Sequence, residues 1–305
     1  MKPLPALTVV VPVYNEAESL PSFLPRLLDF CGQRSWEIVF VNDGSRDDSK
    51  KILESHAKPP LVRVIHHKVN RGYGGALKSG LLEASTPYVV TIDGDGQHEP
   101  DDILRLLEFA VEHDADLVVG RRDATQKADW YRELGKTIIR RFTRLLMPLL
   151  IQDLNSGFKL YRTELVQAYL PVCPDSMAFS DVITLTFLNQ KDLVLEHPIR
   201  VRPRGSGKST ISTYTAIETV MEILNLVMLF NPLKIFLSLS AVCFTFGILW
   251  GTPILLLNRG VSVGAMLAIV SGLIFFVIGL VASQLSSMRL GELSTRRQKI
   301  RARKE

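Results

Sequence analysis

Two carboxylates stand two residues apart in the run Asp93-Gly94-Asp95, directly after an apolar segment. Carboxylates at this spacing can hold a hard divalent cation and leave coordination positions for phosphate oxygens. Gln97 adds a neutral oxygen, so Asp93, Asp95 and Gln97 are the predicted metal ligands. Gly94 lets the backbone come close to a bulky ligand, because glycine has no side chain to obstruct it. This motif predicts a site for a cation and a diphosphate.

Two groups of basic residues could hold anions around that motif. A glycine-containing loop with Arg202 and Lys208 is suited to close over a diphosphate. A second group offers the charges that an anionic acceptor needs: Arg121, Arg122, Arg132 and Lys136. A solvated basic surface is the alternative for both groups. Nucleic acid is not an expected partner, because the aromatic residues that accompany basic ones on RNA-binding sheets are missing.

These residues follow the elements of an alternating strand and helix pattern. Apolar, β-branched runs predict strands over 7–13, 36–41, 61–66, 88–92, 116–120 and 193–201. Helices are expected over 18–31, 72–84 and 130–151. The alternation predicts an α/β fold, a mostly parallel sheet with helices on both faces. Ligands bind beyond the carboxyl ends of such strands. Three strand ends carry polar residues there: Asn15-Glu16, Asn42-Asp43 and Asp93-Gly94-Asp95.

Two long uncharged stretches follow, 24 residues over 235–258 and 29 residues over 260–288. A membrane-spanning helix needs about 20 apolar residues, so both stretches qualify, with a pair of buried core helices as the alternative. Arg259 is the single charged residue between the two stretches, so we predict a tight hairpin there. An amphipathic segment over 213–230 precedes the hairpin and is interpreted as a helix in the membrane interface.

The segment after the hairpin has seven basic residues against two acidic ones. By the positive-inside rule this side is cytoplasmic, and the basic residues would also adhere to anionic headgroups. The chain of 305 residues has no signal peptide pattern at its start, and its three cysteines are scattered, as in a reducing compartment. We therefore expect an integral membrane protein with the catalytic domain and both termini on the cytoplasmic side.

Four motifs in this order resemble the family-two inverting glycosyltransferases with the GT-A fold. They are VPVYNE at 11–16, VNDGS at 41–45, DGDGQH at 93–98 and NSGFK at 155–159. Within this family the chain is similar to the dolichol-phosphate mannose synthase group of polyprenyl-phosphate glycosyltransferases. The resemblance covers roughly residues 5–210. Together with the two uncharged stretches and the basic segment, it predicts a GT-A catalytic domain over 1–210, a juxtamembrane helix over 211–232, a hairpin over 233–289 and a basic tail over 290–305.

The resemblance also implies roles for single residues. The nucleotide-sugar set is Pro12, Tyr14, Glu16, Asp43, Asp93 and Gly94, with Asp43 at the base. The metal would be Mg²⁺ or Mn²⁺. The catalytic set is Asp95, Asp181, Arg202 and Lys208. Three positions depart from the family pattern: Gly207 replaces a serine, Asp181 replaces the more frequent glutamate, and Lys136 stands where a serine is expected near the acceptor phosphate.

The implied reaction is metal-dependent transfer of a hexose, with inversion, from a nucleotide-sugar donor of the GDP-mannose or UDP-glucose type. The acceptor would be a polyprenyl or dolichyl phosphate, and the product a lipid-linked sugar donor. A phosphate with a second pKa of roughly 6 is largely ionised at neutral pH, so it needs no general base. The enzyme would then act by holding two anions close together.

Three other functions compete with this one. Transfer to a hydroxyl of a glycan or glycolipid would need a carboxylate base, for which Asp153 and Asp181 are candidates. A processive synthase would need the motif Gln-x-x-Arg-Trp, and no tryptophan of this chain follows an arginine. Asp93 and Asp95 disfavour a non-catalytic sensor or scaffold. A homo-oligomer is compatible with the sequence, which does not determine the oligomeric state.

Overall fold

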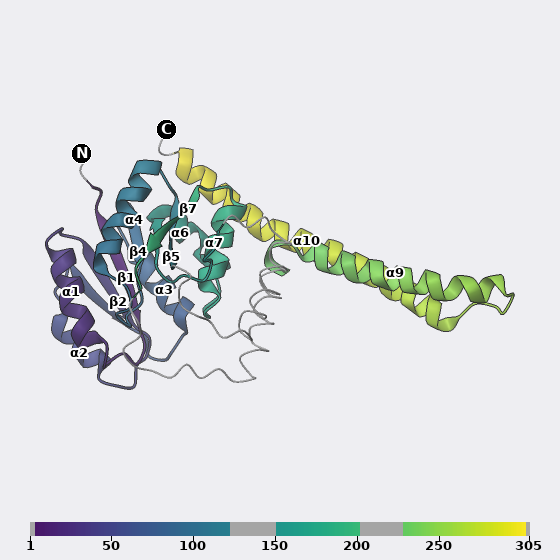
Figure 1. Ribbon diagram of the computed structural model, residues 1–305, viewed down its shortest axis with the longest axis horizontal. Coiled ribbons are helices and arrows are strands. Elements are labelled where there is room, and N and C mark those ends of the chain that lie inside the picture. The colour runs from purple at the N-terminus through teal and green to yellow at the C-terminus, as the bar shows by residue number, and fades with distance from the viewer. Residues whose placement is uncertain (1–3, 123–150, 202–227, 303–305) are drawn as a thin grey trace. The chain divides into compact units, whose positions relative to one another are not determined.

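The computed structural model describes residues 4–122, 151–201 and 228–302 (Figure 1). Contacts divide these residues into two compact units. The first contains 4–122, 151–201 and 293–302, and the second contains 228–292. The predicted helix over 130–151, apart from Ile151, and most of the predicted interfacial helix over 213–230 lie outside the described residues.

The first unit is built on one seven-stranded sheet with the order β3-β2-β1-β4-β6-β5-β7. The strands are β1 (Leu7–Val13), β2 (Glu37–Asn42), β3 (Val62–His66), β4 (Tyr88–Thr91), β5 (Leu117–Arg122), β6 (Lys159–Arg162) and β7 (Val194–Ile199). Neighbouring strands are parallel except around β6, which is antiparallel to both β4 and β5. The predicted mostly parallel sheet is confirmed.

Helices cover both faces of this sheet (Figure 1). They are α1 (Leu20–Gly32), α2 (Ser49–His56), α3 (Tyr73–Leu82), α4 (Pro100–His113), α6 (Thr163–Tyr169), the 3₁₀ turn η1 (Leu170–Val172) and α7 (Phe179–Asn189). Side chains alternate between the faces of a strand. In β1, Val9 and Val11 therefore join α1 and α4 in one buried apolar core, whereas Val10 faces Gly80 of α3.

The six predicted strands are all present, with ends that differ by at most three residues from the predicted ones. β6, α4, α6 and α7 were not predicted. β6 has only four residues, Lys-Leu-Tyr-Arg, so it lacks the apolar run by which the other strands are recognised. This strand nevertheless lies between β4 and β5, and it brings the NSGFK motif into the middle of the sheet.

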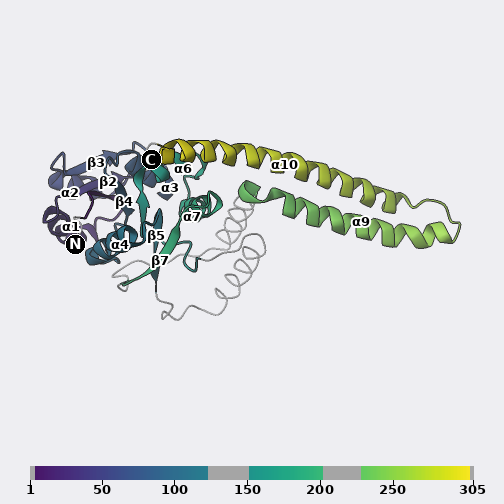
Figure 2. The same cartoon turned by 90° about the horizontal axis from the view of Figure 1, so that it is seen from above.

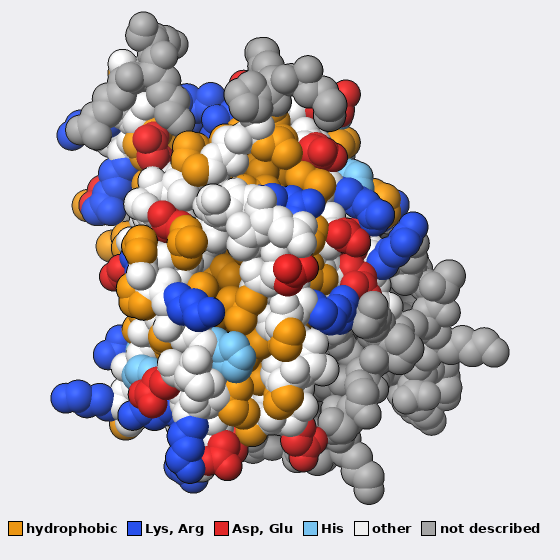
Figure 3. All heavy atoms as spheres, turned by 90° about the vertical axis from the view of Figure 1, so that its left-hand side faces the viewer, with side chains coloured by type: hydrophobic (Ala, Val, Ile, Leu, Met, Phe, Trp, Pro, Cys, Tyr) orange, Lys and Arg blue, Asp and Glu red, His pale blue; other side chains and the backbone are white. Residues whose placement is uncertain are grey.

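The outer face that carries α1 and α2 has a mixed charge. Acidic and basic side chains are interspersed on it rather than gathered by sign (Figure 3). Ion pairs along α2 account for part of this mixture, with Lys51 beside Asp48 and Lys50 beside Glu54. Such interspersed charges are typical of a solvated surface.

The second unit contains α9 (Pro232–Leu256) and most of α10 (Val263–Ala302), which lie side by side (Figure 2). Both helices are long and apolar enough to cross a membrane, and only 11% and 17% of their most apolar windows are buried. That exposure argues against core helices of a soluble protein. The helices approach closely at small residues, since Ser240 Oγ donates to the carbonyl oxygen of Gly272 at 2.8 Å. The predicted hairpin of two apolar helices is confirmed.

The last turns of α10 belong to the first unit, and their contacts were not predicted. Arg297 Nε donates to Asp192 Oδ1 at 2.5 Å, and Arg301 donates to Asp116 Oδ2 at 2.8 Å. The carboxylate of Asp192 is fully buried. Two of the basic residues expected to adhere to lipid headgroups are therefore paired with carboxylates of the sheet domain.

Candidate active site

Three polar segments meet at the carboxyl edge of the central strands. β2, β1 and β4 are consecutive parallel neighbours, so the residues that follow them gather at one edge. Ser19 joins two of these segments, because its hydroxyl donates to Glu16 Oε2 at 2.7 Å and to the carbonyl oxygen of Gly94 at 3.1 Å. Tyr14 is exposed beside them and Pro12 is half-buried. The structure thus brings the predicted nucleotide-sugar residues Pro12, Tyr14, Glu16 and Gly94 together.

Asp93 lies at the centre of this edge, with its side chain about one-third exposed (32%). The hydroxyl of Tyr73 donates to Asp93 Oδ1 at 3.0 Å, and His98 Nε2 lies 3.8 Å from Asp93 Oδ2. Burial raises the pKa of Tyr73 well above its ordinary value, and the charge of Asp93 raises it further. Tyr73 therefore stays protonated and orients the Asp93 carboxylate as a hydrogen-bond donor.

Gly157 of the NSGFK motif packs directly against Asp93. A Cβ atom at Gly157 would lie 2.5 Å from the Tyr73 hydroxyl and 2.7 Å from Asp93 Oδ2. Real Cβ atoms do not approach other atoms so closely, so this position requires glycine. The contact explains why two motifs more than sixty residues apart along the chain form one site.

Asp95 and Gln97 form a turn after β4. The backbone N–H of Gln97 donates to Asp95 Oδ1 at 3.1 Å, which is an Asx turn. Within the described residues, no group of three or more His, Cys, Asp or Glu side chains is arranged to hold a metal ion. Mg²⁺, however, is commonly bound by one or two carboxylates together with substrate phosphates. The partly exposed Asp93 and Asp95, with the amide of Gln97, fit such a site.

Asp43, at the end of β2, is buried and hydrogen-bonded through both oxygens. Its Oδ1 accepts from His67 Nδ1 at 2.6 Å and from the N–H of Arg71 at 2.9 Å. Its Oδ2 accepts from the N–H of Gly72 at 2.9 Å. Gly72 has a φ of +87°, a conformation that side chains disfavour. Asp43 thus holds the turn that begins α3, and its predicted contact with a nucleotide base stays a prediction.

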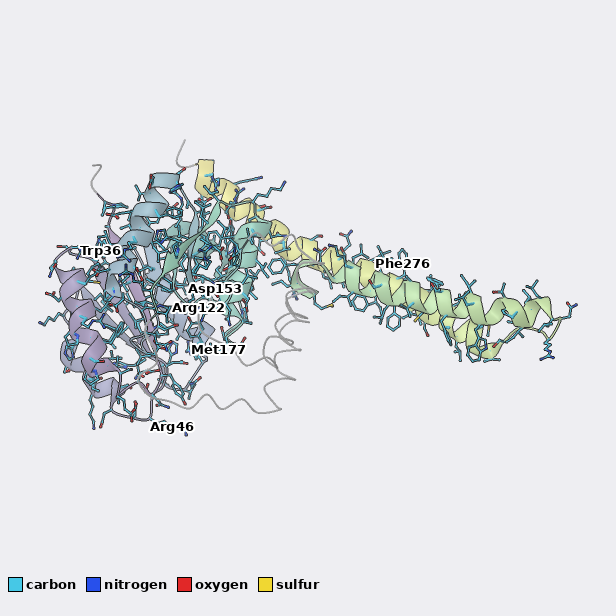
Figure 4. All side chains as sticks on the ribbon, viewed as in Figure 1. Trp36, Arg46, Arg122, Asp153, Met177 and Phe276 are labelled. Carbon is cyan, nitrogen blue, oxygen red and sulfur yellow. The ribbon has the colours of Figure 1, made fainter. Side chains whose placement is uncertain are left out.

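Arg122, one of the predicted acceptor residues, forms a bidentate ion pair with Asp153 (Figure 4). Arg122 Nε donates to Asp153 Oδ2 and Arg122 Nη2 to Asp153 Oδ1, each at 2.8 Å. Burial by itself raises the pKa of Asp153, but the hydrogen bonds and charge of Arg122 outweigh it and hold this pKa below its ordinary value. The backbone N–H of Asp153 donates to Glu196 Oε1 at 2.9 Å, which fixes the pair to β7.

The remaining predicted site residues are distributed as follows. Arg121 precedes Arg122, the last residue of β5, and is half-buried. Asp181 lies half-buried in the first turn of α7. Four predicted residues lie outside the described part of the chain: Arg132, Lys136, Arg202 and Lys208. Tyr73 and Lys159 were not predicted as site residues. Their signals were present, since Tyr73 stands in a glycine-rich turn and Lys159 ends the NSGFK motif.

With this geometry established, comparison with known proteins gives the class. The profile described as Glycosyl transferase family 2 matches residues 8–170, more than half of the chain, and the chain belongs to this family. A second profile, described as GtrB C-terminal hairpin, matches residues 231–288, which include α9 and most of the apolar part of α10. The protein is therefore a family-two glycosyltransferase with two apolar C-terminal helices.

Relatives in this class are named for a lipid phosphate. The undecaprenyl-phosphate 4-deoxy-4-formamido-L-arabinose transferase of Pectobacterium carotovorum is 31% identical over 264 residues, which cover 85% of this chain and 78% of that protein. The enzyme of the same name from Pseudomonas syringae is 31% identical over 271 residues, covering 85% and 76%. The predicted likeness to polyprenyl-phosphate glycosyltransferases is confirmed, whereas the relatives' names mention neither mannose nor dolichol.

Solved structures confirm the fold. Glucosyl-3-phosphoglycerate synthase from Mycobacterium tuberculosis, in complex with Mn²⁺, UDP and phosphoglyceric acid, matches with a TM-score of 0.58. The match covers 73% of this chain and 78% of that chain at 20% identity. The same enzyme with Mg²⁺ and UDP matches with a TM-score of 0.56 at 18% identity. At such identities the likeness concerns the GT-A fold alone.

Proposed function

We propose that this protein transfers a sugar from a nucleoside diphosphate to a polyprenyl phosphate, with inversion at the anomeric carbon. The observation that carries this proposal is the Arg122–Asp153 pair. A hydroxyl acceptor would need a carboxylate base, and the lowered pKa of Asp153 makes that carboxylate a weak base. A phosphate acceptor with a second pKa of roughly 6 is already ionised and needs none. The relatives named for undecaprenyl phosphate support the same acceptor class.

On the donor side, Asp93, Asp95 and Gln97 would hold Mg²⁺ or Mn²⁺ at the end of β4. When bound, this ion would act as a Lewis acid that stabilises charge on the departing diphosphate. Tyr73 supports the assignment, because its hydroxyl fixes one Asp93 oxygen at the edge where nucleotide sugars bind in such sheets. We assign Pro12, Tyr14, Glu16 and Gly94 to the nucleotide sugar.

On the acceptor side, Arg121 and Arg122 would bind the lipid phosphate together with Arg132 and Lys136. The guanidinium of Arg122 is half-exposed and already engaged bidentately by a carboxylate, the geometry in which arginine also pairs with phosphate. Arg202 and Lys208 would close over the diphosphate. The hairpin α9–α10 would anchor the chain in the bilayer, with the catalytic unit and both termini on the cytoplasmic side.

The identity of the donor sugar is the most specific part of the proposal. UDP-glucose and GDP-mannose are the donors that the family resemblance favours, and the relatives add activated 4-deoxy-4-formamido-L-arabinose. Purified protein in detergent would be incubated with each labelled nucleotide sugar, Mn²⁺ and either undecaprenyl phosphate or undecaprenol. We expect one donor to label the lipid and to release nucleoside diphosphate only when undecaprenyl phosphate is present. Labelling of undecaprenol, with no labelling of the phosphate, would establish a hydroxyl acceptor instead.

A further inference from the structure

Lys159, the first residue of β6, is fully buried in the middle of the sheet domain. Lysine is almost never fully buried without partners. Here the ammonium donates to two backbone carbonyl oxygens, that of Leu154 at 2.8 Å and that of Ser180 at 2.5 Å. Burial lowers the pKa of Lys159 to about 7, against the opposing charges of Asp181 and Asp153. The residue is therefore a buried polar connection between two segments of the main chain.

The two carbonyl groups belong to two segments that each carry a carboxylate of the candidate site, Asp153 in one and Asp181 in the other. Leu154 directly follows Asp153, the partner of Arg122, and the same loop continues to Gly157 beside Asp93. Ser180 directly precedes Asp181 in the first turn of α7. One ammonium group thus connects the loop of Asp153 with the helix start of Asp181.

The backbone of β6 does not connect the Asp153 loop to α7. The backbone of Lys159 pairs with Thr91 of β4 and Val119 of β5, so its hydrogen bonds stay within the sheet. Only the side chain reaches both the loop and α7. An apolar side chain of similar length would avoid the cost of burying an amine, since replacing buried charged groups by apolar ones is often neutral or stabilising. An apolar side chain, however, could not donate to the two carbonyl oxygens, so the connection between the loop and α7 depends on the amine.

We propose that Lys159 is a positioning residue of the acceptor half of the site, which ties the main chain beside Asp153 to the main chain beside Asp181. Through this tie and the ion pair of Asp153 it holds Arg122 in place for the acceptor. The identity of the acceptor rests on the proposed function, whereas the tie between the two segments does not.

Lys159→Met and Lys159→Arg test the proposal, with Lys51→Met as a control that removes an exposed lysine of α2. Hydrogen–deuterium exchange would follow the segments 152–158 and 178–182, and steady-state kinetics would give KM for undecaprenyl phosphate and for the donor. For Lys159→Met we expect faster exchange in both segments and an increase of about tenfold in KM for the lipid phosphate, with donor KM within about twofold. Lys159→Arg keeps a cation and should restore most of the acceptor KM.

Unchanged exchange in the two segments would overturn the tie, and so would an equal loss of donor and acceptor binding with faster exchange throughout the sheet. If Lys159→Met does not fold, Lys159→Gln decides, because its side chain stays polar but is one bond shorter than that of lysine. Exchange should then be faster in the two segments alone, and exchange identical to the wild type in both would contradict the proposal. If the wild-type protein does not use undecaprenyl phosphate, the proposed function is wrong. The exchange measurement still tests whether Lys159 ties the two segments together.

Discussion

Asp43 and Asp93 follow two strands of the same parallel sheet, and their surroundings differ. The Asp43 side chain is 4% exposed and accepts hydrogen bonds from His67 and from two backbone N–H groups. The Asp93 side chain is 32% exposed and accepts a hydrogen bond from Tyr73. A carboxylate at a strand end can thus either hold a neighbouring turn or face a ligand. Position in the sheet does not distinguish these roles.

The difference comes from the segments that cover each strand end. β3 lies next to β2 in the sheet, and His67 directly follows β3. The turn of Arg71 and Gly72 also lies beside Asp43, and its N–H groups donate to the carboxylate. These N–H groups and His67 engage both oxygens of the buried Asp43 carboxylate. β4 is covered by the loop of Gly157, which has no side chain at this point and leaves Asp93 partly exposed.

We expect the largest loss of activity from a substitution at the end of β4. Asp95→Ala should lower kcat by about a thousandfold or more with Mn²⁺ present, because a metal ligand beside the departing diphosphate is lost. Turnover with undecaprenyl phosphate measures this. Asp48→Ala, which removes an exposed carboxylate of α2, is the matched control. Activity of Asp95→Ala within tenfold of the wild type would refute the metal assignment.

Gly157→Ala should cause the next largest loss of activity. A methyl group there would displace Tyr73 or Asp93, so we expect kcat/KM to fall by about a hundredfold, as for a small misplacement of reacting groups. The control is Gly32→Ala at the end of α1, where a Cβ atom meets nothing within 4 Å. Comparable losses in both variants, or none in Gly157→Ala, would show that this contact does not shape the site.

Asp43→Asn sharpens the comparison by its effect on stability. The amide can no longer accept through both positions, so either a backbone N–H group of the turn or the buried His67 loses its partner, and we expect a cost of about 2–3 kcal/mol in the free energy of unfolding. Asp93→Asn should leave stability nearly unchanged. Thermal unfolding of the two variants measures the difference. If Asp43→Asn unfolded like the wild type and changed only the preferred nucleotide, Asp43 would be a ligand rather than a structural acceptor.

Tyr73→Phe should have the smallest effect. Removing the hydroxyl takes one hydrogen bond from the charged Asp93, worth about 1.5–3 kcal/mol, and water can replace part of it because Asp93 is partly exposed. We therefore expect kcat to fall about tenfold, with little change in the KM for the donor. Tyr88→Phe, at the other end of β4, is the control. A kcat equal to the wild type would mean that Asp93 needs no orienting donor.

Local sequence patterns were sufficient to predict most of the strands, the apolar hairpin and the candidate site. Continuous apolar runs identified the parallel strands, because a strand buried on both faces needs apolar residues at every position. Two long uncharged stretches identified the apolar hairpin, and the Asp93-Gly94-Asp95 motif identified the site. These features depend on neighbours along the chain, so they are readable from residue order alone.

Only the tertiary structure decided which partners these residues have. The insertion of β6 between β4 and β5, the burial of Lys159 and the pairing of Arg122 with Asp153 all join segments that are distant in sequence. The same holds for Arg297, which the basic pattern of the tail assigned to lipid headgroups and which contacts Asp192 instead. The charge of a residue follows from its type, but its partner follows from the packing of the whole domain. Sequence therefore predicted a candidate site at the strand ends, and the fold separated the partly exposed carboxylate of Asp93 from the buried carboxylate of Asp43, which holds a turn.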